Sequence, residues 1–183
     1  METELTWSSY ARELFDSLNS VSAARIQDVI TLITKTAIDN KTIWVLGNGG
    51  SAATASHFCV DLSKGAATRL NRQIKAIPIL DLVPLQTAFS NDLSYDSAIA
   101  NSLSAFASKG DLAIFISGSG DSKNVVTGAV QAKQMGLTTV GLTGFQGGRV
   151  GPLVDIEINV KLTDMQLIED AHHAICHFIS KRL

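Results

Sequence analysis

Apolar positions in the first 40 residues recur at spacings of three and four, which is typical of amphipathic helices. Two helices are expected, over residues 3–19 and from a capping Ser20 or Ser22 to about Asn40. Two helices before the first strand are more than one face of a sheet needs. They are therefore expected either to form an oligomer contact or simply to pack on the sheet. The apolar faces are Trp7, Tyr10, Leu14 and Leu18 in the first helix, and Ile26, Val29, Ile30, Ile33 and Ala37 in the second.

Beyond residue 40 the pattern becomes a series of short, largely apolar runs, which predict buried strands. Pro78 places the second run at a sheet edge or strand end, because proline cannot donate a backbone hydrogen bond. Helical patterns separate the runs, so we expect one α/β domain over residues 1–183, a three-layer sandwich whose parallel sheet has helices on both faces. The expected strands are 42–46, 73–80, 111–116, 138–142 and 155–160.

The helices between these strands have recognisable start and stop signals. Ser51 is the expected N-cap of an Ala-rich helix, and residues 65–70 are expected to be a loop or a frayed helix end. A helix over 82–89 is expected to break at residues 90–92. Further helices are expected over 96–107, ended by Gly110, over 123–135, closed by Gly136, and over 164–181.

The first strand runs directly into a glycine turn, Gly47-Asn48-Gly49-Gly50-Ser51, that opens a helix. Backbone N–H groups and the helix dipole at such a turn can bind an anion. The spacing matches neither the dinucleotide fingerprint nor the Walker lysine loop, and a plain strand-to-helix turn is the alternative. His57 and Asp61 are four residues apart and share a face of the following helix, which favours a functional turn.

A second loop, Ser117-Gly118-Ser119-Gly120-Asp121-Ser122, follows the third strand. Its three serine hydroxyls, its backbone amides and the helix that starts beside Ser122 together predict a phosphate cradle that needs no arginine. Both loops follow parallel strands, and ligands of such sheets bind beyond the carboxyl ends of the strands. A flexible connection is the alternative.

Three of the four histidines lie in the last helix. Glu169, His173 and His177 are spaced four residues apart on one face, with His172 beside it. Such a group favours a functional site, and a solvated polar face is the alternative. The packing stripe of this helix is expected to be Ile168, Ala171, Ile175 and Phe178.

Composition narrows the class of protein. The chain has 183 residues, of which 45% are apolar, 17% are charged and 3 are proline, as in a compact globular domain. A net charge of −2 gives no electrostatic reason to expect binding to nucleic acid or to an anionic membrane. The first seven residues are acidic and polar, so we expect no signal peptide. The isolated Cys59 and Cys176 are expected to be reduced thiols in a cytoplasmic protein.

Taken in order, the Gly47–Ser51 turn, His57, Asn91-Asp92, the Ser117–Ser122 loop, Gly147-Gly148 and the histidine-bearing last helix resemble the sugar isomerase (SIS) domain family. The likeness extends from about residue 20 to the C-terminus and is to the phosphoheptose isomerase branch. It implies a five-stranded parallel sheet flanked by helices, a homotetramer with active sites at subunit contacts, and a divalent metal, usually zinc. It also implies conversion of sedoheptulose 7-phosphate to D-glycero-D-manno-heptose 7-phosphate for lipopolysaccharide or another surface polysaccharide.

The resemblance also implies roles for individual residues. Asn48, Gly49, Gly50 and Ser51 would bind the sugar, and Asn91 and Asp92 would contact its hydroxyls. Ser117, Gly118, Ser119 and Ser122 would hold the phosphate. His57, Asp61, Glu169 and His177 would surround the metal, with Glu169 also at the substrate, and Asp61 and His177 would be the acid/base pair.

Three positions depart from the pattern of that family. Asp61 stands where the family has glutamate, Glu169 where it has glutamine, and Gly118 where it has threonine. Two histidines and two carboxylates suit a zinc-type dication and would balance its charge. The shorter carboxylate at position 61 bears on which sugar the site accepts, because it changes the reach of the expected base.

Two functions fit the resemblance. One is aldose–ketose isomerisation of a phosphosugar through an enediol. The other is a non-catalytic phosphosugar-binding module that regulates other proteins, as in members associated with the replication initiator. Asp61, Glu169 and His177 are all ionisable, which favours the enzyme.

Overall fold

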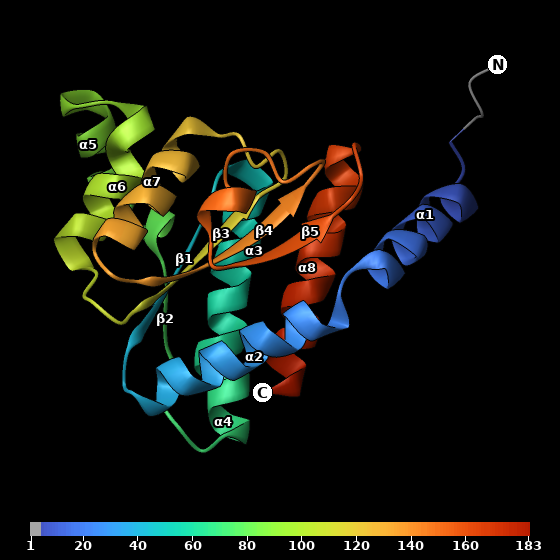
Figure 1. Ribbon diagram of the computed structural model, residues 1–183, viewed down its shortest axis with the longest axis horizontal. Helices are drawn as coiled ribbons and strands as arrows, with labels where there is room; N and C mark the ends of the chain where they lie inside the picture. Colours follow the sequence, from blue (N-terminus) through green and yellow to red (C-terminus); the bar gives the residue numbers. More distant parts are fainter. Residues whose placement is uncertain (1–4) are drawn as a thin grey trace.

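The computed structural model describes residues 5–183 and shows an α/β fold built on one five-stranded parallel sheet (Figure 1). The strand order β2-β1-β3-β4-β5 and the flanking helices confirm the predicted fold class. Pro78 lies at the end of the edge strand β2, as predicted. The strands are β1 (Thr42–Gly47), β2 (Lys75–Pro78), β3 (Leu112–Ser117), β4 (Thr138–Gly144) and β5 (Ile156–Val160).

Helices cover both faces of the sheet. The main helices are α1 (Trp7–Ser20), α2 (Ala23–Ile38), α3 (Gly49–Val60), α5 (Val83–Asp92), α6 (Tyr95–Phe106), α7 (Lys123–Gln134) and α8 (Met165–Arg182). Short segments are the π-helix η1 (Asp61–Ala66), the helical turn α4 (Ala67–Arg69) and the 3-10 turns η2 (Ile79–Asp81) and η3 (Gly151–Leu153).

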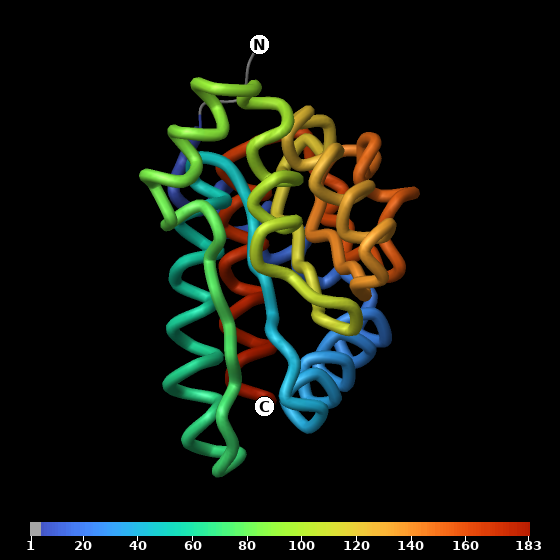
Figure 2. The backbone as a smooth tube through the Cα atoms, turned by 90° about the vertical axis from the view of Figure 1, so that its left-hand side faces the viewer, coloured from blue at the N-terminus to red at the C-terminus, as the bar shows by residue number. Residues whose placement is uncertain are grey.

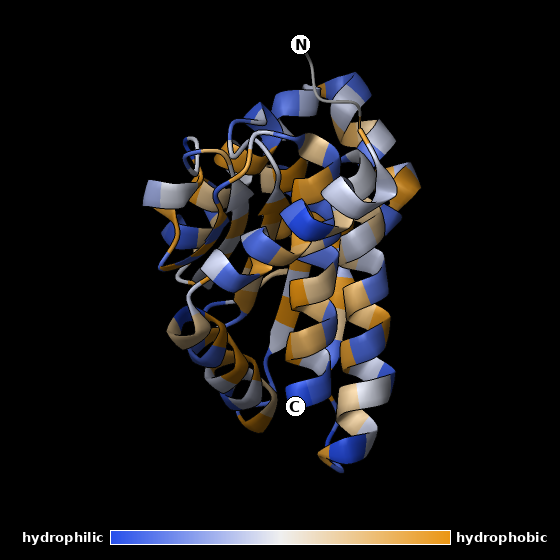
Figure 3. Ribbon diagram, turned by 90° about the vertical axis from the view of Figure 1, so that its right-hand side faces the viewer, coloured by the Kyte–Doolittle hydropathy of each residue, from blue (hydrophilic) through white to orange (hydrophobic). Residues whose placement is uncertain are grey.

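Alternating side chains along the strands supply two hydrophobic cores. In β1, Ile43 and Val45 pack under α2, α3 and α8, whereas Trp44 and Leu46 pack under α6 and α7. Figure 3 shows apolar residues along the strands and mixed polar and apolar residues on the helices that cover them. Full burial of a side chain as large as Phe58 contributes about 1.5–3 kcal/mol, so these two cores fix the sheet between its helical layers.

The strand order places both glycine-containing loops side by side. β1 and β3 are neighbours, and Gly47 pairs with Ile116 at their carboxyl ends. The chain leaves β1 toward β2 on one side and leaves β3 toward β4 on the other. A reversal of this kind opens a crevice between the two loops, which is where open α/β sheets bind ligands.

Several element boundaries differ from the prediction. Asn48, not Ser51, is the N-cap of α3, because the chain already turns into the helix at Gly49. Of the two alternatives for residues 65–70, the structure shows a helix end and not a loop, since η1 and α4 continue α3 as far as Arg69 and Leu70 is the C-cap. The helix α5 runs through residues 90–92 and ends at Asp92, and α6 ends at Phe106, ahead of the turn at Gly110.

The predicted packing stripes are correct except at their ends. On α8, Ile168, Ala171 and Ile175 are buried, but Phe178 is 52% exposed, because the buried stripe continues through Ile179 instead. Trp7 of α1 is 81% exposed, since α1 extends beyond the body of the molecule and packs beside α8 (Figure 1). Within residues 5–183, every helix falls short of the combined length and hydropathy that a membrane crossing requires.

Candidate metal and phosphosugar site

Helices α3 and α8 lie side by side and bring most of the predicted chemistry together (Figure 2). Residues spaced by about one turn on α3 face residues spaced by one turn on α8. Thr54 lies next to His173, and His57 lies next to His177. The two helices therefore form a row of polar pairs that begins at the carboxyl edge of the sheet and runs along the helices.

Three histidines form a compact cluster in the middle of this row. One ring nitrogen from each of His57, His173 and His177 lies within 4.8 Å of the other two, so the group can hold a metal ion. The Nε2 atoms of His57 and His177 are 3.1 Å apart. Burial lowers the pKa of His173, and the nearby His177 and His57 lower it further, which favours the neutral form that binds metals.

Asp61 lies beside this cluster, at the point where α3 changes into the π-helix η1. Its carboxylate oxygens are 3.8 Å from Nε2 of His57 and 3.7 Å from Nε2 of His177. The hydroxyl of Ser180 lies 3.4 Å from Asp61 Oδ2, and the Asp61 side chain is 28% exposed. π-Turns within helices are frequent at functional sites. Asp61 is thus held next to two histidines while its carboxylate remains accessible.

Glu169 lies at the other end of the row, next to the glycine turn. A β-carbon at Gly50 would overlap the Glu169 carboxylate, so a larger residue there would displace this side chain from its present position. Glu169 lines a small hollow of about 100 Å³ between the two loops. The hollow is also lined by Asn48, Ser51, Ile116, Ser117, Gly118, Ser119, Ser122 and Met165.

The hydroxyls of the serine loop differ in their availability. The Ser117 hydroxyl is buried and accepts a hydrogen bond from Gly120 N at 3.2 Å. Ser119 accepts from Asp121 N at 3.1 Å, whereas Ser122 caps α7 without a side-chain capping bond. Ser119 and Ser122 are therefore the two hydroxyls best placed to bind an anion, and Ser117 shapes the loop. Packing explains the glycine at position 118, because a β-carbon there would overlap the side chain of Met165.

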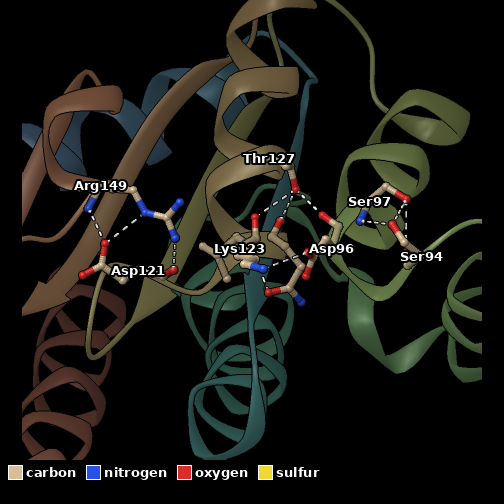
Figure 4. A network of polar contacts seen from close by, with 9 residues as sticks. Ser94, Asp96, Ser97, Asp121, Lys123, Thr127 and Arg149 are labelled. Atoms are coloured by element: carbon tan, nitrogen blue, oxygen red, sulfur yellow. Dashed lines mark hydrogen bonds and ion pairs between the residues drawn. The ribbon is translucent and has the colours of Figure 1, made fainter.

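The loop after β4, which contains Gly147, Gly148 and Arg149, packs against the serine loop, Ser117–Ser122. Gly148 adopts φ +55°, and a β-carbon there would overlap the backbone of Gly120. Arg149 donates from its backbone N and its Nε to Asp121 Oδ1, both at 3.1 Å (Figure 4). Lys123 lies 3.6 Å from Asp96. Both cations are thus paired with carboxylates, which agrees with a cradle built from hydroxyls and amides.

Asn48 is fixed by a pair of side chains that the sequence does not single out. It exchanges two side-chain hydrogen bonds of 2.9 Å with the buried Asn124, and its Oδ1 also accepts from the Tyr95 hydroxyl at 2.9 Å. Asn124 and Tyr95 come from α7 and α6, far away in the sequence, and so carried no local signal. The sequence pattern also gave no sign of Thr54, because its partner His173 is 119 residues away along the chain.

The structure does not bring every predicted residue to this site. Asn91 and Asp92 are exposed at the end of α5, where Asn91 Nδ2 donates to Asp92 at 2.9 Å. Gly49 and Gly50 lie in the first turn of α3. The sugar contacts of Asn91 and Asp92 remain predictions, consistent with sites that the resemblance places at subunit contacts.

Both cysteines are free thiols, as predicted, and both are buried. Burial raises the pKa of Cys59 to about 12 and raises that of Cys176 still further. A thiol must lose its proton to bind a metal ion, so neither cysteine competes with the histidines as a ligand.

His172 has a structural role, unlike its neighbour His173. It is fully buried, and its Nε2 lies 3.0 Å from the carbonyl oxygen of Thr143. Burial lowers its pKa from 6.5 to about 4, against a smaller opposing effect of the hydrogen bond. The folded protein therefore keeps His172 neutral at pH values where the unfolded chain takes up a proton.

We expect stability to fall as the pH drops from about 6.5 toward 4, because only the unfolded state binds this proton there. Between pH 7 and pH 5 the loss due to His172 is about 2 kcal/mol. Urea unfolding with a chelator present should show that loss in the wild type but not in His172→Gln. Equal pH dependence of the two proteins would contradict this account.

Comparison with known proteins identifies the family of this chain. The SIS domain family matches residues 6–144. The phosphoheptose isomerase of Geobacter sulfurreducens is 31% identical and aligns over 94% of this chain and 93% of its own length. That of Aliarcobacter butzleri is 38% identical over 81% of this chain and 80% of its own.

The solved structure of a phosphoheptose isomerase from Francisella tularensis has the same fold. It superposes with a TM-score of 0.85 at 24% identity, over 96% of this chain and 92% of that one. Because the family match spans most of the chain and the relatives align along most of their length, the chain belongs to the SIS domain family, in its phosphoheptose isomerase branch, and is an isomerase.

Proposed function

We propose that the protein interconverts the aldose and ketose forms of a phosphosugar, with sedoheptulose 7-phosphate and D-glycero-D-manno-heptose 7-phosphate as the substrate pair. One observation carries the proposal. The helices α3 and α8 bring His57, Asp61 and His177 together, and the same two helices also line the hollow that contains Ser119 and Ser122. The names of the curated relatives support the heptose as the substrate.

In this proposal the serine loop binds the phosphate and the histidine end of the row performs proton transfer. Asp61 removes the proton from the carbon beside the carbonyl, which gives an enediol. The protonated Asp61 carboxyl then returns the proton at the neighbouring carbon, and Asn48 and the carboxylate of Glu169 orient the sugar hydroxyls. His177, which the resemblance makes the acid, serves in this proposal as a ligand in the histidine cluster. The proton removed and the proton returned balance, so the isomerisation needs no external oxidant or reductant.

A divalent cation, with zinc as the first candidate, is proposed to bind at the histidine cluster. The donor set fits such an ion, because imidazole nitrogens are common zinc ligands and three of them converge here. When bound, the cation polarises the carbonyl and stabilises negative charge on its oxygen.

Exchange of carbon-bound protons tests this function directly. The purified protein is incubated with zinc and C5, C6 or C7 ketose phosphates in D₂O, and the C1 and C2 positions are followed by NMR. We expect deuterium uptake together with formation of the aldose, fastest with the heptose. Binding of the sugar phosphates without exchange of any of them would instead indicate a regulatory phosphosugar-binding module.

We also propose a homotetramer in which α1 and α2 form subunit contacts. Trp7, Phe15 and Phe178 expose large apolar areas along α1 and α8. Replacing Phe15 and Phe178 with serine should dissociate the assembly, as measured by light scattering at micromolar concentration. Replacing the exposed Val130 of α7 with serine is the matched control and should change nothing. A wild-type monomer would refute the proposal.

A further inference from the structure

We infer that His173 is the third metal ligand of this chain, in a site of three imidazoles with His57 and His177. Asp61 and Glu169 are then left outside the set of metal ligands. The assignment of His173 stands on the histidine cluster alone, and only the role left to Asp61 rests on the proposed isomerase function.

The three rings are arranged around a common centre. Their centroids are 4.4–4.9 Å apart in every pair, and the planes of each pair are inclined by 70–81°. Three rings that are mutually almost perpendicular and equally spaced can direct one nitrogen each toward the same point. His173 is equivalent in this arrangement to the two histidines that the sequence resemblance already assigns to the metal.

The distances suit a small dication. With zinc–nitrogen bonds of about 2.0–2.1 Å, two ligands of a tetrahedral site are about 3.3–3.4 Å apart. The Nε2 atoms of His57 and His177 are 3.1 Å apart, and all three donor nitrogens lie within 4.8 Å of one another. Small side-chain rotations would therefore close the set around an ion.

Thr54 supplies the outer support that ligating histidines usually have. Its buried hydroxyl is 3.4 Å from Nδ1 of His173. In the tautomer in which Nδ1–H donates to Thr54, Nε2 carries the free lone pair that a metal needs. His173 is thus oriented by α3 even though it belongs to α8.

The two carboxylates are less suited to complete the set. Glu169 is one turn closer to the sheet edge, where it packs against Gly50 and lines the hollow of the serine loop. Asp61 is 3.7–3.8 Å from two of the histidines, but the group of donors that converges within 4.8 Å contains His173 instead. Three neutral ligands leave a fourth position open for a substrate oxygen, as catalytic zinc sites require. Asp61 then remains free to accept a proton.

Metal affinity tests the inference independently of turnover. Zinc and Co(II) are titrated into metal-free wild type, His173→Phe, His173→Gln, Glu169→Gln and Asp61→Asn, with affinity measured by chelator competition. His173→Phe keeps the edge-to-face ring packing but has no lone pair. We expect its zinc affinity to fall at least about 100-fold, beyond the usual effect of a supporting residue. His173→Gln should also bind weakly, and the visible Co(II) spectrum should change in both variants.

The carboxylate variants separate this site from its rivals. Glu169→Gln and Asp61→Asn should stay within about fivefold of wild-type affinity and keep its Co(II) spectrum. Thr54→Val should lose about 10- to 100-fold. Unchanged affinity in both His173 variants, or a loss in Asp61→Asn as large as that in His173→Phe, would overturn the inference. Loss of proton exchange in the wild type with this affinity pattern intact would refute the proposed reaction and leave the metal site standing.

Discussion

Asp61→Asn will lower the turnover of the sugar phosphate by about 10²- to 10⁴-fold, the usual cost of removing a general base. Asparagine has nearly the same size but cannot accept the proton, and Asp61 lies beside His57 and His177 where that proton would be removed. The variant should still bind the sugar phosphate through the serine loop. Turnover is measured at saturating zinc, so that any change in metal occupancy does not contribute.

Asp155→Asn is the matched control, because it neutralises a carboxylate at the amino end of β5, away from the site, where it pairs with Lys133 across 3.3 Å. Its turnover should equal that of the wild type. If Asp61→Asn retains more than about a tenth of wild-type turnover, Asp61 is not the base, and Glu169 is the next candidate.

Asp61→Glu tests the match between base and substrate. It restores the longer carboxylate that the family resemblance leads one to expect. On a heptose phosphate it should maintain or raise activity if the proposed substrate is correct. A collapse of activity would mean that the shorter side chain is matched to another sugar.

Ser119→Ala combined with Ser122→Ala will weaken binding of inorganic phosphate and substrate by at least tenfold. Each hydroxyl is worth about 1.5–3 kcal/mol to a charged acceptor, and both serines line the hollow between the loops. Calorimetry measures the affinity, and urea unfolding checks that the fold is intact. If the double variant binds phosphate as tightly as the wild type, the phosphate site is not in this loop.

Ser63→Ala combined with Ser104→Ala provides the matched control. Both serines are exposed, and neither lines the hollow of the serine loop. This variant removes the same number of hydroxyls and should bind phosphate as tightly as the wild type.

The elements of the fold could be read from local patterns because each depends on nearby residues. Apolar runs such as Ile43 to Leu46 must be buried, and their alternation with helices requires a parallel sheet. Boundaries were less predictable. The glycine turn enters α3 at Gly49, before Ser51, and tertiary packing continues the helix through η1 and α4 as far as Arg69.

The candidate site was also only partly predictable from the sequence. Spacing alone places His57 with Asp61, and Glu169 with His173 and His177, since residues four apart share a helix face. It does not determine the alignment of α3 against α8. That alignment places His173 with His57 and His177, and moves Glu169 to the hollow beside Gly50.

The sequence by itself therefore determined the fold class, the two loops and the residue types of the site, because each of these follows from local periodicity and turn chemistry. Only the tertiary structure decided which donors meet. The packing of α3 on α8 and the pairing of β1 with β3 join residues more than 65 positions apart, and no local pattern encodes such a contact. It likewise decided that His172 is buried while its neighbour His173 joins the histidine cluster, because one side of α8 faces the sheet and the other faces α3.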